Sequence, residues 1–448
     1  MGRLFGTDGI RGRANQYPIT CDIALKTGRA VGAYIRNQGK HVLIIGKDTR
    51  ESGGMLESAI ASGAASQGVD VYLAGVIPTP GIAFLTQTVD GAGAGVVISA
   101  SHNPFYDNGI KIFGMGGIKL TDEEQLFIED SILDEDKDVS QDSVGQISVF
   151  AEACARYAAF LKSKFPCKKL HAPIRIVADA SHGAASLVGP MVFDDPDLFD
   201  VQWIHCSPDG RNINDNCGSQ HTEILRQEVL SQRSDIGIAF DGDADRLIVV
   251  DHTGAQITGD GILAVCGRFA KDQNRLKNNM VVSTIMSNVG FVQCLKSLDI
   301  AHEVTDVGDR MVLERMKEKG AVIGGEDSGH MIFLDDHSTG DGLLSALRLL
   351  EVMAVTGKPL KELAGIMTVY PQILMNVEVD ASRPDFTQIK PIAEAIAQVE
   401  SQLGDQGRVL VRYSGTQPLL RVMVEGPEAE LTRECCQRIC DAIRENIA

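Results

Sequence analysis

The chain has 448 residues, a length that favours roughly three or four domains over one compact core. Hydrophobic residues make up 44% of the sequence and charged residues 23%, proportions typical of a soluble globular protein. A net charge of −18 disfavours binding to nucleic acid or to an anionic membrane surface. The amino terminus shows no signal-peptide pattern, and the longest apolar runs, such as 96–98, are too short to span a bilayer.

The 10 cysteines are scattered along the chain without any C-x-x-C pair. Cys436 and Cys440 would share one face of a helix, but no histidine follows them to complete a metal site. We interpret the cysteines as reduced thiols, which predicts a cytoplasmic protein.

Strand and helix patterns alternate in the first third of the chain. A helix is predicted from 21 to 36, with Thr20 as its N-terminal cap. Apolar runs at 41–45, 69–74 and 94–98 predict buried strands.

The same alternation begins again near residue 173 and a third time near residue 280. Strands are predicted at 174–178 and 236–240 in the second unit, and at 280–285, 301–304 and 321–323 in the third. Such alternation predicts parallel sheets with right-handed crossovers, in a coarse repeat of one α/β unit.

The last part of the chain has a different order of elements. Strands at 372–379, 408–413 and 420–425 are separated by one helix and followed by another, which predicts an antiparallel α+β domain. The predicted fold therefore has three consecutive α/β domains with mixed or parallel sheets and a C-terminal α+β domain. The predicted domain ranges are 1–150, 151–252, 253–367 and 368–448.

Three aspartates alternate in Asp241-Gly242-Asp243-Ala244-Asp245, directly after the predicted strand at 236–240. Because like charges repel, three carboxylates that converge on one point require a hard divalent cation such as Mg²⁺, which takes oxygen ligands. A calcium-binding helix-loop-helix is excluded, since Arg246 and His252 replace its obligatory glycine and glutamate. A solvated acidic loop is the alternative. Mg²⁺ beside an arginine indicates phosphoryl chemistry.

A second loop, Ser99-Ala100-Ser101-His102-Asn103-Pro104, follows the predicted strand at 95–98. Ligands of open α/β sheets bind beyond the carboxyl ends of the strands. Pro104 disfavours a helix at Asn103, so the loop can stay open and present a hydroxyl. A serine in such a loop usually makes only turn hydrogen bonds. Beside a metal cluster, however, it is a candidate nucleophile, and Lys111 follows shortly.

Four further polar loops have compositions that suit anions or sugars. Segment 6–12 surrounds Arg11 with backbone amides, and segment 306–310 is a charged turn. Segment 412–418 combines a guanidinium with hydroxyls, which suits a phosphate, and segment 324–330 suits sugar hydroxyls. A simple hairpin turn is the alternative for each of the last two. The phosphate-binding P-loop motif and the dinucleotide fingerprint are both missing.

Together and in this order, these loops resemble the α-D-phosphohexomutase superfamily across essentially the whole chain. The resemblance rests on segments 5–12, 98–111 and 241–246, with Pro208-Asp209-Gly210 and Asn212-Ile213-Asn214. It is closest to the bacterial branch that acts on glucosamine phosphates. The resemblance implies four domains around a central cleft.

The resemblance also implies an activity, that of an intramolecular phosphotransferase. Glucosamine 6-phosphate and glucosamine 1-phosphate would interconvert through a phosphoserine and a 1,6-bisphosphate. The product would feed UDP-N-acetylglucosamine and peptidoglycan precursor synthesis.

Individual residues take roles from the same resemblance. Ser101 would carry the phosphate and, with Asp241, Asp243 and Asp245, hold one Mg²⁺ per subunit. Arg11 and Lys111 would flank the transfer site, and Lys111 or His330 would serve as general acid or base. The residues expected to contact the sugar or its non-reacting phosphate are Arg310, Glu326, Ser328, Arg412, Ser414, Gly415 and Thr416. The adjacent carboxylates of Glu326 and Asp327 would favour a sugar with an ammonium group.

Other functions fit parts of the same pattern. A phosphomannomutase or phosphoglucomutase would differ in the hexose 6-phosphate it prefers, and a metal-dependent sugar-phosphate phosphatase would release phosphate. A catalytically silent sensor would need neither the serine nor the aspartates. The expected partner is a hexosamine phosphate, with no nucleic acid and no membrane, and the chain is expected to be a monomer or a homodimer.

Overall fold

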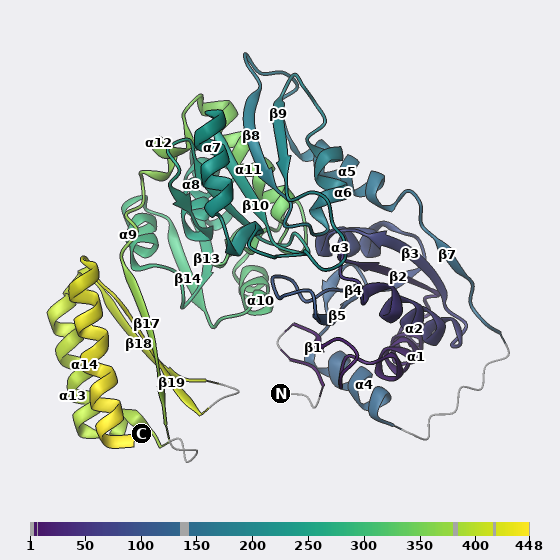
Figure 1. The fold of residues 1–448 in the computed structure, drawn as a ribbon, viewed down its shortest axis with the longest axis horizontal. Helices are drawn as coiled ribbons and strands as arrows, with labels where there is room; N and C mark the ends of the chain where they lie inside the picture. Colours follow the sequence, from purple (N-terminus) through teal and green to yellow (C-terminus); the bar gives the residue numbers. More distant parts are fainter. Residues whose placement is uncertain (1–3, 7, 135–142, 380–383, 415–417, 448) are drawn as a thin grey trace. The chain divides into compact units, whose positions relative to one another are not determined.

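The computed structural model describes residues 4–6, 8–134, 143–379, 384–414 and 418–447. These residues divide into two compact units (Figure 1). The first contains Met1–Ile285 and Ala301–Ala364, and the second contains Met286–Ile300 and Gly365–Ala448.

The first unit opens with a mixed sheet. Its strands lie in the order β1 (Ile10–Arg13), β5 (Asp107–Gly114), β4 (Ala92–Ile98), β2 (Val42–Lys47), β3 (Asp70–Val76) and β7 (Ile147–Val149), and β6 (Ile118–Lys119) pairs with β5. Parallel pairing joins β2 to β3 and β4, whereas β5 runs antiparallel to β4 and β1. The helices of this part are α1 (Cys21–Asn37), α2 (Gly53–Ala65), α3 (Thr79–Thr88) and α4 (Asp122–Leu133).

Two further mixed sheets follow in the same unit. The second has the order β12 (Gln256–Ile257), β11 (Leu247–Asp251), β10 (Ile236–Phe240), β8 (Ile174–Asp179), β9 (Phe199–Ile204). The third has the order β14 (Ala301–Thr305), β13 (Met280–Thr284), β15 (Ile323–Gly325), β16 (Met331–Phe333). Their helices are α5 (Ala153–Lys164), α6 (Ala185–Val192), α7 (Glu223–Gln232), α8 (Gly259–Asp272), α10 (Asp309–Lys319), α11 (Gly342–Thr356) and α12 (Leu360–Ala364).

The three sheets share one local design. In each of them a buried strand ends in a polar loop and pairs antiparallel with the next strand: β4 with β5, β10 with β11, and β15 with β16. The loops between these strands are the serine loop (99–106), the aspartate loop (241–246) and the glutamate loop (326–330). The design therefore gives each sheet one polar loop at the carboxyl end of a central strand.

The second unit is antiparallel. It contains the sheet β17 (Gln372–Glu378), β19 (Leu419–Glu425), β18 (Arg408–Tyr413), together with α9 (Val289–Ser297), α13 (Lys390–Leu403) and α14 (Ala429–Ile447). Both α13 and α14 pack on the sheet, and aliphatic and cysteine side chains form the core between them. Buried Glu425 accepts a hydrogen bond from the Val289 amide and pairs with Arg408, which ties α9 to the sheet.

The predicted fold class is confirmed, as are several of its elements. Helix α1 begins at Cys21, and the Thr20 side chain accepts a hydrogen bond from the Ile23 amide, as expected of an N-terminal cap. Strand β10 has the predicted bounds. The return strands β5, β11 and β16 were not predicted, because apolar periodicity does not reveal strand direction. The central cleft stays a prediction.

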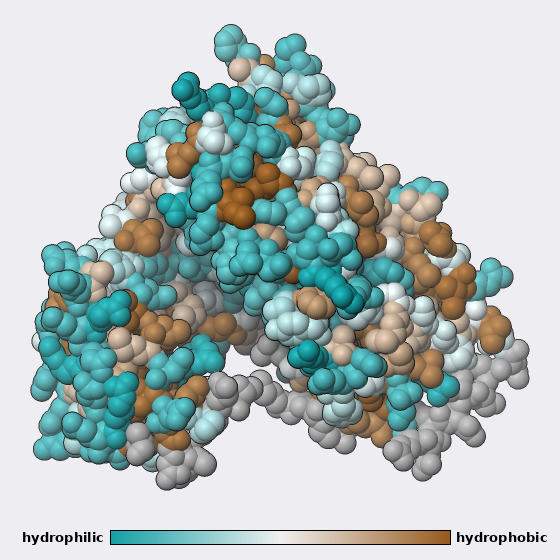
Figure 2. Space-filling model, viewed as in Figure 1, coloured by the Kyte–Doolittle hydropathy of each residue, from teal (hydrophilic) through white to brown (hydrophobic). Residues whose placement is uncertain are grey.

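The surface has no dominant apolar region on the side shown. Hydrophilic residues prevail there, and apolar residues form scattered patches (Figure 2). Within the described residues, every helix is too short or too polar to cross a membrane.

Helices α1 and α2 approach each other closely through two glycines. A Cβ atom on Gly28 would lie 2.1 Å from the carbonyl oxygen of Ile60, and one on Gly63 would lie 2.2 Å from that of Leu25. Real Cβ atoms do not approach backbone this closely, so a methyl group at either position must push the helices apart.

We expect Gly28→Ala to lower the free energy of unfolding by about 1–3 kcal/mol, because overpacking outweighs the better helix propensity of alanine. Urea denaturation monitored by circular dichroism measures this change. Gly54→Ala is the control, since a Cβ on exposed Gly54 meets nothing within 4 Å, and its stability should be unchanged or slightly higher. Equal stability of Gly28→Ala and the wild type would contradict the packing argument.

Candidate active site

The serine loop places the hydroxyl of Ser101 against the aspartate loop. Ser101 is 1% exposed, and its Oγ donates a hydrogen bond to Oδ2 of Asp241 at 2.6 Å. Its backbone is left-handed, with φ of 54°. The Ser101 amide donates to Oγ of Ser99 at 2.9 Å, and Ser99 donates in turn to Asp48 at 2.6 Å. Ser99 therefore supports the loop, while Ser101 faces the carboxylates.

Arg50 holds the same loop through its carbonyl groups. Its Nη2 donates to the carbonyl oxygens of Ser101 at 2.9 Å and Asn103 at 2.8 Å, and its Nε donates to Asp48 at 2.8 Å. Asp48 and Arg50 follow β2, which neighbours β4, so both loops lie at one edge of the sheet. Neither residue was predicted to belong to the site. Their position beyond a buried strand was the available signal.

The three aspartates converge as predicted. Asp241, Asp243 and Asp245 are at most 5% exposed, and one carboxylate oxygen from each lies within 4.8 Å of the others. Oδ1 of Asp243 and Oδ1 of Asp245 are buried and have no hydrogen-bond partner among the described residues. Two orphaned anionic oxygens in an all-oxygen cluster fit a hard divalent cation such as Mg²⁺.

The charges of the cluster interact strongly. Burial, together with the charges of Asp245 and Asp243, raises the pKa of Asp241 well above its ordinary value. Burial also opposes ionisation of Asp245, but Lys111 and His330 outweigh it and hold its pKa well below the ordinary value. The neighbouring side chains therefore compensate only part of the negative charge.

Lys111 and Thr79 bring groups from the first sheet to the cluster. Lys111, on β5, places Nζ 2.8 Å from Oδ2 of Asp243 and 3.3 Å from Oδ2 of Asp245. Burial disfavours its charged form, but Asp243, Asp8 and Asp245 raise its pKa well above the ordinary value. Thr79 begins α3; its amide donates to the backbone carbonyl oxygen of Asp243 at 3.0 Å, and its hydroxyl donates to Oδ2 of the Asp243 carboxylate. The start of α3 thus contacts both the backbone and the carboxylate of Asp243.

Asp8, in the amino-terminal loop, contacts several cationic side chains. It accepts a hydrogen bond from Arg11 and lies 3.2 Å from Nζ of Lys111. Nζ of Lys119 contacts both Asp8 and Asp309, and therefore bridges the first sheet to the start of α10. Burial opposes its charge, but Asp309 and Asp8 raise the pKa of Lys119 above its ordinary value. The sequence offered no signal for Lys119, a single lysine in a short hairpin strand.

His330 lies between two of these carboxylates. Its Nδ1 is 3.7 Å from Asp245 and its Nε2 is 3.7 Å from Asp309. Burial opposes the charged ring, but the nearby carboxylates of Asp245 and Asp309 raise the pKa of His330 above its ordinary value. Backbone pairing also joins Arg246 to His330, so the aspartate and glutamate loops are in contact.

A cavity of about 360 Å³ opens beside these groups. The predicted residues Arg11, Asp245, Glu326 and His330 line it, together with Leu4, Gly6, Asp8, Gly9, Arg246, Val307, Gly308 and Asp309. Glu326 accepts a hydrogen bond from the Gly308 amide at 3.0 Å, and Ser328 lies within 3.4 Å of it. The cavity therefore presents cations, carboxylates and hydrogen-bonding groups from three sheets to a small polar ligand.

The other predicted contact residues lie elsewhere. Arg310 pairs with Asp122 and Glu314. Asp327 does not line the cavity, and its carboxylate faces the Asp260 amide at the start of α8. Arg412 and Ser414 belong to the second unit, at the end of β18. Gly415 and Thr416 lie outside the described residues. Substrate contact by all these residues stays a prediction.

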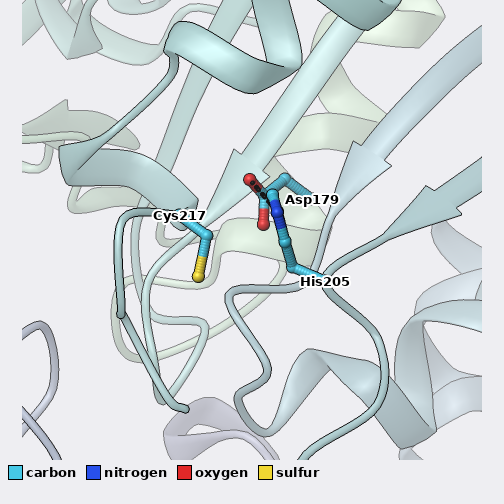
Figure 3. Close-up of side chains that lie close together, drawn as sticks. All are labelled: Asp179, His205 and Cys217. Atoms are coloured by element: carbon cyan, nitrogen blue, oxygen red, sulfur yellow. Dashed lines mark hydrogen bonds and ion pairs between the residues drawn. The ribbon is translucent and has the colours of Figure 1, made fainter.

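A second cluster of potential metal ligands lies at the carboxyl end of β8 (Figure 3). Asp179, His205 and Cys217 come close together there. Asp179 already accepts hydrogen bonds from the Ser181 amide, the Gly218 amide and Nδ1 of His205, at 2.8–2.9 Å. Burial, with the charges of Asp179 and Asp215, raises the pKa of Cys217 to about 12. Because these donors already occupy the oxygens of Asp179, we interpret this cluster as structural.

Comparison with known families accounts for nearly the whole chain. Residues 2–139, 155–254 and 258–370 match the alpha/beta/alpha domains I, II and III of phosphoglucomutase/phosphomannomutase, and residues 374–442 match its C-terminal domain. The chain belongs to the phosphoglucomutase/phosphomannomutase family, and it is an enzyme of the phosphohexomutase class. The four domain boundaries predicted above stay predictions.

Curated relatives and solved structures extend this assignment. Proteins named phosphoglucosamine mutase are 58% identical in Desulforapulum autotrophicum, over 99% of each chain, and 49% identical in Syntrophus aciditrophicus, over 100% of each chain. A phosphoglucomutase/phosphomannomutase family protein from Burkholderia thailandensis has the same fold, with a TM-score of 0.82 at 23% identity, over 99% of this chain and 98% of that one. Aspergillus fumigatus N-acetylphosphoglucosamine mutase, solved with GlcNAc-6P and magnesium, gives a TM-score of 0.67 at 17% identity, over 99% and 96%.

We expect Lys119→Met to lower the free energy of unfolding by about 2–4 kcal/mol, because it leaves the part-buried carboxylates of Asp8 and Asp309 without their shared cation. Lys277→Met is the control, since Lys277 and Asp335 form an exposed pair, and such pairs contribute less than about 1 kcal/mol. Urea denaturation compares the two variants. Equal losses would show that the Lys119 bridge adds nothing to the fold.

Proposed function

We propose that this enzyme interconverts glucosamine 6-phosphate and glucosamine 1-phosphate, with Ser101 as the phosphoryl carrier. The observation that carries the proposal is the Ser101 hydroxyl, which is buried and held 2.6 Å from a carboxylate of the aspartate cluster. The curated relatives named phosphoglucosamine mutase support the choice of sugar. In this role the enzyme supplies the amino sugar for UDP-N-acetylglucosamine and peptidoglycan precursors.

The chemistry needs a carrier because carbons 1 and 6 of a hexose lie at opposite ends of the molecule. In the first half, a sugar hydroxyl attacks the phosphoserine phosphorus, the bond from phosphorus to Ser101 Oγ breaks, and Oγ receives a proton. The sugar is then a 1,6-bisphosphate. After it turns round, Ser101 Oγ attacks the other phosphorus and loses its proton. The bond from that phosphorus to the sugar oxygen breaks and the sugar oxygen receives a proton, which leaves the isomeric monophosphate and the phosphoserine.

The surrounding cations stabilise the transferring group. Arg11 lines the cavity, and Lys111 stays charged between three carboxylates, so both can offset the negative charge that the phosphoryl group carries. The nitrogen-bearing side chains next to the aspartates, Lys111 and His330, are the two candidates for exchange of the hydroxyl proton. Glu326 lines the cavity and is the acidic group that would contact the amino sugar.

Asp241, Asp243 and Asp245 would hold one Mg²⁺, together with a phosphate oxygen of Ser101. The orphaned oxygens of Asp243 and Asp245 support this assignment. When bound, the ion would neutralise negative charge on the phosphoryl group. The protein's own part is to keep the Ser101 hydroxyl next to Asp241 and away from water.

The remaining parts of the proposal concern the residues that bind the substrate, the cellular location of the enzyme and its oligomeric state. Arg310, Ser328, Arg412, Ser414, Gly415 and Thr416 are proposed to contact the sugar or its second phosphate. The free cysteines support a cytoplasmic location, and we propose a monomer or a homodimer.

We expect Ser101→Ala to lower turnover of glucosamine 6-phosphate by at least about 10³-fold, because the carrier oxygen is lost. A coupled assay for glucosamine 1-phosphate measures turnover, and mass spectrometry locates phosphate in the peptide that contains both serines. Ser99→Ala should retain the phosphate on Ser101 and part of the activity. Phosphate on Ser99 would refute the choice of hydroxyl. Phosphate release without isomerised product would identify a phosphatase.

We expect Asp243→Asn to weaken Mg²⁺ binding and turnover together, each by about tenfold or more, because one ligand of a three-carboxylate site loses its charge. Calorimetric titration measures metal affinity independently of activity. Asp272→Asn, on the exposed surface of α8, removes the same charge and should change neither quantity. Full activity of Asp243→Asn without added metal would rule out the site.

A further inference from the structure

One motif from the sequence has no role in the site described so far. The segment Asp209–Asn214 lies between β9 and the Cys217 turn, in the part of the first unit that carries the aspartates. At its end, Asn214 reaches the serine loop. Its Nδ2 donates to the carbonyl oxygen of Ser101 at 2.9 Å and to that of Asn103 at 3.0 Å. These are the same two carbonyl groups that accept hydrogen bonds from Arg50.

We propose that Asn214 is a positioning residue for Ser101, acting through the backbone of the serine loop. The proposal rests on the phosphoryl-carrier role of Ser101 in the proposed function. Arg50 holds the loop from the first sheet, and Asn214 holds the same carbonyl groups from the second. The aspartates also belong to the second sheet. Asn214 therefore holds the serine loop in a fixed position relative to these aspartates.

The loop needs such support because of its backbone conformation. Ser101 has a φ of 54°, and a non-glycine residue keeps a left-handed backbone only where its surroundings hold it there. There is also little room for water to replace Asn214. A Cβ atom on Gly242 would lie 2.5 Å from the Ser101 carbonyl oxygen and 2.8 Å from Nδ2 of Asn214. The carbonyl is therefore packed against the aspartate loop and depends on side-chain donors.

Asn214 is itself held in place by the structural cluster of Figure 3. Its backbone is left-handed, with φ of 60°, a conformation that asparagine tolerates better than most residues. Its amide donates to the Ser181 carbonyl at 3.0 Å, and the Ser181 amide donates to Asp179. Asp179 also binds the Gly218 amide and His205, so it fixes both ends of segment 205–218. This gives the pair of buried Asp179 and half-buried His205 a structural role that needs no metal.

The two contacts to Ser101 come from one scaffold. Asn214 holds its carbonyl oxygen and Asp241 accepts from its hydroxyl, while β9 and β10, which precede these two segments, both pair in parallel with β8. Loss of the Asn214 amide should therefore let the serine loop shift relative to Asp241. A shift of about 1 Å at a reacting group can lower a rate by about 10²-fold.

Two variants distinguish the effect of the Asn214 side-chain amide from the effect of its left-handed backbone. Asn214→Asp keeps the shape but replaces the donor with an acceptor that faces two carbonyl groups. Asn214→Gly keeps the left-handed backbone and removes the side chain. Asn216→Asp is the matched control, because Asn216 is exposed, has a φ of 53° and donates only to its neighbour Asp215 among the described contacts.

The test combines steady-state kinetics with hydrogen exchange. For both Asn214 variants we expect kcat to fall about 10- to 100-fold with KM for glucosamine 6-phosphate within about threefold of the wild type. We also expect faster amide exchange in the peptide spanning 99–107, measured by mass spectrometry. Asn216→Asp should match the wild type in both measurements.

Several results would overturn the proposal. Unchanged kcat in both variants would do so, as would faster exchange with normal kcat, which would make Asn214 merely structural. A loss in Asn214→Asp alone would point to repulsion by the new carboxylate. If the wild type does not isomerise the sugar phosphate, the proposed function fails, and hydrogen exchange alone tests the contact. Faster exchange in both Asn214 variants then supports positioning of the serine loop by Asn214, and unchanged exchange rejects it.

Discussion

The burial of three carboxylates within one small volume is the constraint around which this molecule is organised. Isolated buried charges are costly, and like charges in contact more so. Lys111, His330 and Arg246 compensate part of this charge, and the oxygens of Asp243 and Asp245 that have no hydrogen-bond partner among the described residues mark the remainder. Because Lys111 belongs to the first sheet, His330 to a loop of the third and the carboxylates to the second, charge compensation brings the three sheets together at this edge.

The repeated strand–loop–strand design explains how one site draws on several sheets. Each sheet of the first unit offers one polar loop between a central strand and its antiparallel neighbour. Such loops lie beyond the carboxyl ends of the parallel strands, where α/β proteins place their ligands. The loops then differ in chemistry: one has a hydroxyl, one has carboxylates, and one has Glu326 and His330. A shared architecture thus supplies different groups to one site: the aspartate and glutamate loops line the cavity, and the hydroxyl of the serine loop lies against Asp241.

Several functional loops depend on backbone conformations that are unfavourable in isolation. Ser101, Asn214 and Ala244 all have left-handed φ angles without being glycine. Each of them is held by hydrogen bonds from other segments, such as those of Arg50 and Asn214 to the Ser101 carbonyl. The rigid surroundings, not the loop sequences, keep these residues in place. The site is therefore preorganised by contacts at a distance from the reacting oxygen.

The sequence alone determined the features that depend on neighbouring residues. An apolar run before alternating aspartates predicted strand β10 and the convergence of the three carboxylates, and the loop before Pro104 predicted a presented serine hydroxyl, which the structure instead buries against Asp241. The direction of the return strands, the partners of Asp48 and Lys119, and the turn of Asp327 away from the cavity were decided only by the tertiary structure. The physical reason is separation along the chain. Lys111 and Asp243 are 132 residues apart, and no local pattern encodes which distant charge will neutralise a buried one.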